Sequence, residues 1–214
     1  MRGTVFFNRL VTEYPLPVTK TLRQEHTEHT RRALMSAAAT LFADKGYAGT
    51  SIDDVVARAR VTRGALYHHF ENKLDMFKAV CEAAETRVVQ RVQETASRPG
   101  TPKQRLVAAL DTYFDECQNP TYQAIVLREG HDPQIRREGT RYIPAMSEMV
   151  RGMVNQLRAE QVVQTANPEI LAQLVCAVLC EAAYAVGTSP NPAETKRHAK
   201  ELVHRMLFGE DLPA

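Results

Sequence analysis

The residues best suited to contact another molecule fall in one short polar stretch, residues 62–73. Arg63 can form paired hydrogen bonds with the edge of a guanine in the major groove of DNA, or with a phosphate. Tyr67, His69 and Lys73 supply a hydroxyl, an imidazole and an ammonium group, which suit the phosphate contacts that position a protein on a duplex. These residue types at this spacing predict a DNA-contacting surface. The alternative is an ordinary short helix with a polar exposed face.

Gly64 favours the first interpretation. A glycine inside a helix costs about 1 kcal/mol relative to alanine, so its presence there requires a reason. A residue without Cβ allows the helix backbone to come close to the floor of a groove. The residues predicted to contact DNA are Thr50, Thr62, Arg63, Gly64, Ala65, Tyr67, His68, His69 and Lys73.

Three capping signals predict the helices that position this stretch. Thr50 and Asp53 have the spacing of a capping box, which predicts a helix from Ser51. Thr62 is a second N-cap and opens a helix of one to two turns. Asn72 is a third N-cap and predicts a helix from the next residue. Two short helices joined by a tight turn are typical of a helix-turn-helix.

Three runs carry a resemblance to a known family: LFADKGYAGTS at residues 41–51, VTRGALYHHF at residues 61–70, and the pair Lys73-Leu74. Together they resemble the DNA-binding domain of the tetracycline-repressor (TetR) family of regulators, over residues 31–77. The chain departs from the family pattern at Arg60, where the family usually has glycine in the turn between the two short helices. An arginine there must adopt a positive φ at some strain or alter the turn.

The pattern of apolar residues predicts an all-α chain with two domains. Residues 1–27 are predicted as a flexible N-terminal extension, residues 28–75 as a three-helix helix-turn-helix domain, and residues 76–214 as a helical domain for ligand binding and dimerisation. The first helix is expected from about residue 27 to Lys45. Later helices are expected at residues 73–95, 102–117 and 120–129, within 134–158, and at 168–186 and 193–208.

Composition narrows the class of protein. Residues 1–78 carry a net charge of +4 and residues 79–214 a net charge of −2, which suits a protein that holds nucleic acid at one end. The four cysteines show neither metal-type nor disulfide-framework spacing. No nucleophile elbow, phosphate loop or histidine cluster is present, so we predict no enzymatic activity, metal or cofactor. No apolar run approaches the roughly 20 residues of a membrane span and no signal peptide is evident, which predicts a cytoplasmic protein.

The domain at residues 76–214 has two interpretations. The family resemblance implies a homodimeric sensor, most simply a repressor released from a palindromic operator by a small apolar or aromatic effector. The other interpretation is a purely structural dimerisation domain without an effector. Methionines adapt to irregular cavities, although they also fill ordinary cores. The predicted pocket lining is Phe77, Phe114, Tyr122, Met146, Met149, Met153, Glu181 and Tyr184.

The apolar segment at residues 168–189 carries one charge beyond its first turn, Glu181. This carboxylate is predicted either to pair with Arg128, Arg141 or His131, or to anchor the effector. A neighbouring stripe on the same helix is predicted to face the last helix and to form a four-helix bundle with a second copy of the chain. That interface is predicted to consist of Leu171, Val175, Leu179, Ala182, Val186, Leu202, Val203, Met206 and Leu207.

Overall fold

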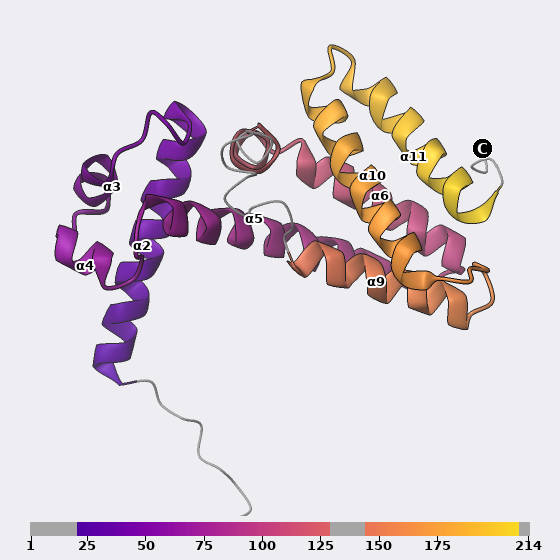
Figure 1. Cartoon of the computed structure of the whole chain (residues 1–214), viewed down its shortest axis with the longest axis horizontal. Coiled ribbons are helices and arrows are strands. Elements are labelled where there is room, and N and C mark those ends of the chain that lie inside the picture. The colour runs from indigo at the N-terminus through magenta and orange to yellow at the C-terminus, as the bar shows by residue number, and fades with distance from the viewer. Residues whose placement is uncertain (1–20, 129–143, 210–214) are drawn as a thin grey trace, which may run out of the picture.

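The described part of the chain, residues 21–128 and 144–209, is built from helices, and no strand occurs in it. Figure 1 shows this computed structural model as two groups of helices joined by one long helix, α5. The predicted all-α fold class is confirmed. The helices are α2 (Leu22–Lys45), α3 (Ile52–Ala59), α4 (Arg63–Tyr67), α5 (Lys73–Ala96), α6 (Pro102–Cys117), α7 (Pro120–Tyr122), the π-helix η1 (Gln123–Arg128), α9 (Pro144–Ala159), α10 (Pro168–Thr188) and α11 (Pro192–Phe208).

A capping box starts α2 earlier than predicted. The Thr21 hydroxyl accepts a hydrogen bond from the Gln24 backbone N–H at 3.3 Å, and the Thr21 N–H donates to the Gln24 side-chain oxygen at 2.8 Å. The helix therefore begins at Leu22 and not near residue 27. Residues 1–20 of the predicted N-terminal extension lie outside the described residues. Gly46 ends the helix with a φ of 72°, which glycine adopts without steric cost.

The cap of α3 is Ser51, one residue later than predicted. Its hydroxyl accepts from the Asp54 N–H at 3.1 Å, and its own N–H donates to the Asp54 carboxylate at 3.2 Å. Arg60 follows the helix with φ 56° and ψ 42°, a left-handed conformation. The chain thus takes the first of the two options expected for a non-glycine residue in this turn, and it keeps the turn at the cost of some backbone strain.

The core of the first group of helices, α2 to α4 with the start of α5, is closed by aromatic rings from α2, α5 and the loop between α2 and α3. The ring centroids of Phe42 and Phe77 are 5.1 Å apart, and those of Tyr47 and Phe77 are also 5.1 Å apart. Phe77 is fully buried in this cluster. It therefore supports the helix-turn-helix, and its prediction as an effector contact is wrong.

The second group of helices packs around the later turns of α5. α6 lies along α5, and α10 packs against both α9 and α11. The Lys200 ammonium of α11 lies 2.6 Å from the Asp111 carboxylate of α6, and Lys196 lies 2.6 Å from Asp115. These pairs form only at the observed rotation of α11 on α6, to which such partly exposed ion pairs add a small stabilisation.

One expected helix of this group is described only in part, and another differs from expectation. α9 is described from Pro144 onward, and the part of the predicted helix before this residue lies outside the described residues. The helix predicted at residues 120–129 makes one α-helical turn and then widens into the π-helix η1. A π-helix is rare and often occurs at functional sites. η1 packs against α2, α5 and α10, so it joins the two groups of helices.

The rotation of α10 corrects the predicted dimer stripe. Val175, Leu179 and Val186 are buried within the protomer, as are Val203 and Leu207 of α11. They form the core between α10, α9 and α11, so their assignment to the dimer interface is wrong. The large apolar side chains that stay exposed on these two helices are Ile170 and Leu174 of α10, and Leu202 and Met206 of α11, which belong to the predicted stripe.

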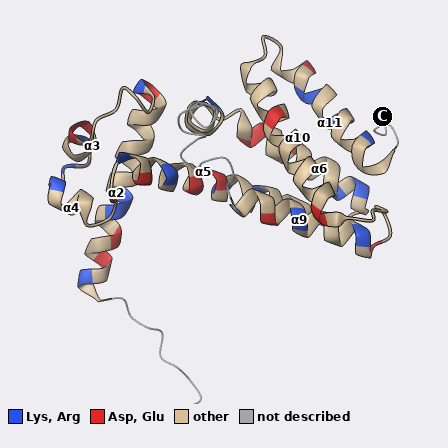
Figure 2. Cartoon of the chain, viewed as in Figure 1, with Lys and Arg blue, Asp and Glu red and all other residues tan. Residues whose placement is uncertain are grey.

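α10 also corrects the expectation about membrane spans. It has 21 residues and is long and apolar enough, by length and composition alone, to cross a membrane. Only 33% of its most apolar window is buried within the protomer. Figure 2 shows that most of its length carries no charge. One side of this helix packs in the core of the protomer, and the other side leaves apolar side chains exposed.

Candidate functional site

The short helix α4 displays its polar side chains as predicted. Leu66 and Phe70 are buried inward, whereas the Tyr67 side chain is 53% exposed. Arg63 and His68 are also exposed, and His69 is half-buried. Burial, followed by the charges of His68 and Arg31, lowers the pKa of His69, so its imidazole is neutral at neutral pH. The face therefore offers hydrogen-bonding groups around one dominant cation, Arg63.

Arg63 is held by an acidic residue of α3. Its Nε donates to Asp53 Oδ1 at 2.6 Å, and its Nη2 donates to Asp53 Oδ2. Figure 2 shows this acidic start of α3 next to the basic start of α4. The pair uses the Nε–Nη2 edge of the guanidinium and leaves the Nη1 hydrogens outside the pair. Asp53 thus orients the arginine while leaving it groups that can reach a base or a phosphate.

Gly64 lies where no contact within the protomer requires a glycine. A Cβ added there would come no closer than 3.8 Å to any atom, the Thr62 hydroxyl oxygen. The packing of the protomer therefore does not account for this glycine, and the open space around it is compatible with close approach of α4 to a groove floor. Ala65 beside it is half-buried, and Thr62 caps α4 by accepting from the Ala65 N–H at 3.2 Å.

Two predicted DNA contacts are engaged inside the protein. The Thr50 side chain is buried, and its hydroxyl donates to the carbonyls of Leu41 at 3.1 Å and Gly46 at 2.8 Å. This hydroxyl is therefore used within the protein, and the cap of α3 that was predicted for Thr50 is made by Ser51. The Lys73 ammonium donates to the carbonyls of Tyr47 and Thr50 at 2.9 and 3.1 Å. Lys73 therefore ties the start of α5 to the loop before α3.

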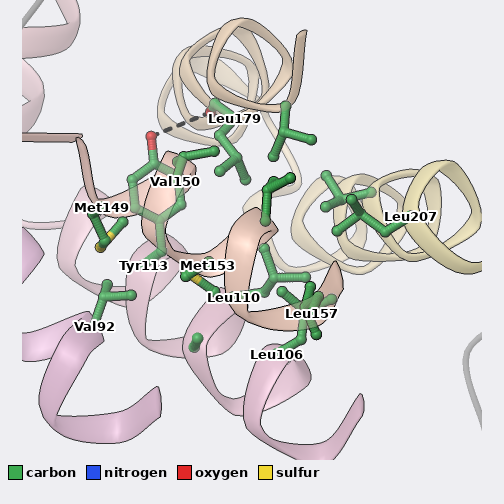
Figure 3. A pocket seen from close by; sticks show the side chains of 14 residues that line it. Val92, Leu106, Leu110, Tyr113, Met149, Val150, Met153, Leu157, Leu179 and Leu207 are labelled. Atoms are coloured by element: carbon green, nitrogen blue, oxygen red, sulfur yellow. Dashed lines mark hydrogen bonds between the residues drawn. The ribbon is translucent and has the colours of Figure 1, made fainter. Parts of the chain in front are cut away.

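An apolar cavity of about 30 Å³ lies in the second group of helices. Figure 3 shows its lining side chains converging from α5, α6, α9, α10 and α11. Met149 and Met153 line it, as predicted. The Tyr113 hydroxyl, which the sequence analysis did not select, points away from the cavity and donates to the Leu179 carbonyl at 3.3 Å. The lining is apolar on all sides, so the cavity favours an apolar group.

The other predicted pocket residues lie elsewhere. Met146 and Phe114 are buried but do not line this cavity. Tyr184 lies in a separate open groove of about 320 Å³ between η1 and the end of α10. Glu181 is exposed on α10, so it is not the buried carboxylate that either of its predicted roles requires. Of its three proposed partners, Arg141 and His131 lie outside the described residues.

A buried carboxylate does exist, and it is Glu85 of α5. This side chain is 5% exposed and accepts a hydrogen bond from the Tyr122 hydroxyl at 3.0 Å. Burial raises the pKa of Glu85 to about 7, and the bond from Tyr122 opposes that shift only in part. The sequence held a signal for it: Glu85 interrupts the apolar stripe of Cys81, Val88 and Val92 on one helical face.

Comparison with known proteins decides the family. Residues 34–80 match the family described as bacterial regulatory proteins, tetR family. Residues 103–210 match the tetracyclin repressor-like C-terminal domain, which alone covers half of the chain. This chain belongs to the TetR family. Its members are DNA-binding transcription factors and not enzymes, in agreement with the class predicted from the sequence.

Individual TetR-family relatives match over only part of their length. The chain is 34% identical over 85 residues to the transcriptional activator FasR of Mycolicibacterium smegmatis, covering 40% of this chain and 39% of that protein. It is 32% identical over 80 residues to the regulator AcrR of Shigella flexneri, covering 37% of each. The chain therefore spans about two fifths of the length of these relatives.

The fold match extends over most of the chain. A TetR-family regulator from Pectobacterium atrosepticum superposes with a TM-score of 0.69 at 28% identity, covering 90% of this chain and all of that chain. FadR from Bacillus subtilis, solved in complex with stearoyl-CoA, has a TM-score of 0.65 at 16% identity, covering 84% and 98%. The second domain is therefore of the TetR type in its helical arrangement, although its sequence has diverged.

Proposed function

We propose that this TetR-family regulator binds a palindromic operator as a homodimer and acts as a repressor that a small, largely apolar effector releases. The observation that carries the proposal is the exposed α4 face around Arg63, joined by α5 to a domain that contains an apolar cavity. Repression is further supported by the repressors KstR2 and BepR among its relatives, although FasR is an activator. The DNA contacts, the interface and the effector are inferences about this chain.

The proposed dimer uses the exposed apolar face of α10 and α11. Ile170, Leu174, Leu202 and Met206 are 53%, 56%, 63% and 39% exposed, which is unusual for side chains of this size on two adjacent helices. A second copy of the chain is the occupant we propose, because a two-fold axis pairs the same face with itself and makes a four-helix bundle. Two α4 helices would then meet successive major grooves about 34 Å apart.

The proposed effector site is the cavity between α5, α6, α9, α10 and α11. At about 30 Å³ it is roughly a tenth of the smallest usual ligand pocket, so it must widen to admit an effector. Met149 and Met153 are flexible side chains that can move to make room. FadR, which shares the fold, was solved with stearoyl-CoA, so a small-molecule complex is compatible with this helical arrangement.

The second candidate is a regulator whose C-terminal domain only dimerises. The small volume of the cavity favours it, because a closed apolar core also leaves voids of this size. One experiment distinguishes the two candidates. Fluorescence anisotropy measures binding of the protein to the DNA flanking its gene while small apolar and aromatic compounds are added one at a time. We expect at least one compound to release the DNA at a concentration that leaves the protein folded. Binding that resists every compound supports the structural domain.

Removal of Arg63 tests the DNA-binding face. We expect Arg63→Ala to weaken binding to the operator by about 10-fold to 100-fold, since each lost base contact costs roughly 1–3 kcal/mol, and to weaken binding to random DNA far less. The measurement is anisotropy on both duplexes over a range of salt. Arg58→Ala is the matched control, because Arg58 is an exposed arginine of α3 outside α4. An operator affinity that Arg63→Ala leaves unchanged would show that another surface reads the DNA.

A further inference from the structure

Glu85 is the only buried acidic side chain among the described residues, and it lies on α5, which joins the two groups of helices. One of its oxygens, Oε1, accepts from Tyr122. The other, Oε2, is buried and has no hydrogen-bond partner in the described part of the protein. A carboxyl group has acceptor sites for several donors, and a buried oxygen without one is costly. The structure thus leaves an acceptor inside the protein that no described residue uses.

The surroundings of Glu85 connect it to the apolar cavity. Tyr113 of α6 lies close enough for the two groups to interact electrostatically, and the same Tyr113 lines the cavity. Val92, which lies two turns after Glu85 on the same face of α5, lines the cavity as well. Glu85 does not line the cavity itself, but two residues that do line it connect it to the cavity: Tyr113 by interaction and Val92 along α5.

Among the described residues, the groups that interact with Glu85 give it no charge of opposite sign. Those that interact with it are two tyrosines and three cysteines from α6, α7 and α10: Tyr113, Cys117, Tyr122, Cys176 and Cys180. None of these side chains is a cation. A structural ion pair normally supplies a cation to a buried carboxylate, because an isolated charge is expensive in the interior. In the described part of the protein no cation fills that position next to Glu85.

We propose that Glu85 is the polar anchor of the effector, and that it receives a cationic or hydrogen-bond-donating group at the end of an otherwise apolar molecule. This inference rests on the proposed function of the cavity, where the apolar body would displace Met149 and Met153. Tyr113 lines the cavity and interacts with Glu85, so its side chain must move for one ligand to reach both. Its single 3.3 Å hydrogen bond to the Leu179 carbonyl is weak enough to break when a ligand enters. The effector class is an amphiphilic amine or alcohol and not an anion.

Three small ligands that differ only in their end group test this proposal on the full-length protein. Decylamine, decanol and decanoate share a ten-carbon body and differ in the end group, and isothermal titration calorimetry at pH 7.5 compares their affinities. We expect decylamine to bind most tightly and decanoate most weakly. We expect Glu85→Gln to weaken decylamine by about ten-fold or more while it leaves decanol within about two-fold, because the amide keeps the shape and removes the charge.

Glu82→Gln is the matched control, since Glu82 is an exposed glutamate on the same helix. An equal loss of decylamine binding in Glu82→Gln would place the amine at the surface and overturn the proposal. So would wild-type protein that binds decanoate as tightly as decylamine, or that binds no decylamine. The wild-type ranking needs no variant and stands even if Glu85→Gln fails to fold. An anionic compound that releases the operator would leave the proposed function intact and remove Glu85 as the anchor.

Discussion

A Leu202→Arg variant is expected to be a folded monomer that binds the operator about 100-fold more weakly than the wild type. Leu202 is 63% exposed in the protomer, so the substitution leaves the protomer core intact. In the proposed dimer each leucine occurs twice, and its burial contributes roughly 1.5–3 kcal/mol. Two arginines at the axis would replace that gain with two buried charges of the same sign. A monomer then loses the benefit of linking two DNA-binding units, which is worth about 10²-fold to 10⁴-fold.

Val203→Arg provides the contrast. Val203 is the chain neighbour of Leu202, but its side chain is wholly buried between α10 and α11. The sequence analysis placed Val203 in the dimer interface. The structure instead predicts that this variant unfolds or aggregates and does not yield a folded monomer. Analytical ultracentrifugation gives the mass of each variant, and circular dichroism reports whether it is folded. A Leu202→Arg protein that sediments as a dimer would move the interface away from α10 and α11.

The stability of the protein is expected to fall between pH 5 and pH 8 because of Glu85, and Glu85→Gln is expected to remove that fall. In the unfolded chain Glu85 loses its proton near its ordinary pKa of 4.5, whereas in the folded chain its pKa is about 7. The folded state therefore binds more protons between these values, and the free energy of unfolding decreases as pH rises through them. The full loss is about 3 kcal/mol, from 1.36 kcal/mol per pH unit.

Urea denaturation of the two proteins at pH 5 and pH 8 measures this difference. We expect Glu85→Gln to gain about 3 kcal/mol relative to the wild type between these pH values. Burial raises the pKa of Tyr113, Tyr122 and Cys117, so these neighbours keep their protons throughout the range.

The remaining neighbours of Glu85 are the thiols of α10. A hydrogen bond with Cys180 lowers the pKa of Cys176, and the same bond, followed by burial, raises that of Cys180. The charge of Glu85 also raises the pKa of both thiols, so this coupling is part of the pH dependence that Glu85→Gln removes. Glu82→Gln should show the pH dependence of the wild type. Equal pH dependence in the wild type and Glu85→Gln would mean that Glu85 is ionised in the folded state.

Local signals predicted most of the helices. Thr62, Asn72 and Pro102 act within one turn of the chain, so their effects are readable without knowledge of what packs nearby. The same holds for the exposed face of α4, whose inward residues Leu66 and Phe70 are set by helical spacing. The capping errors at Thr21 and Ser51 are also local: two hydroxyl residues competed for the capping position before α3, and the geometry of the preceding turn buried Thr50.

The sequence by itself determined that the chain is helical, where most of its helices begin, which short helix presents Arg63, and that its family is TetR. Only the tertiary structure decided which carboxylate is buried and which stripe of α10 faces the core. Glu85 and Glu181 both interrupt apolar helices, and periodicity places each on a stripe. Periodicity defines the angle between stripes on one helix but not the rotation of that helix against its neighbours. That rotation depends on contacts between residues far apart in the sequence, such as Lys200 with Asp111, which exist only once the helices are packed.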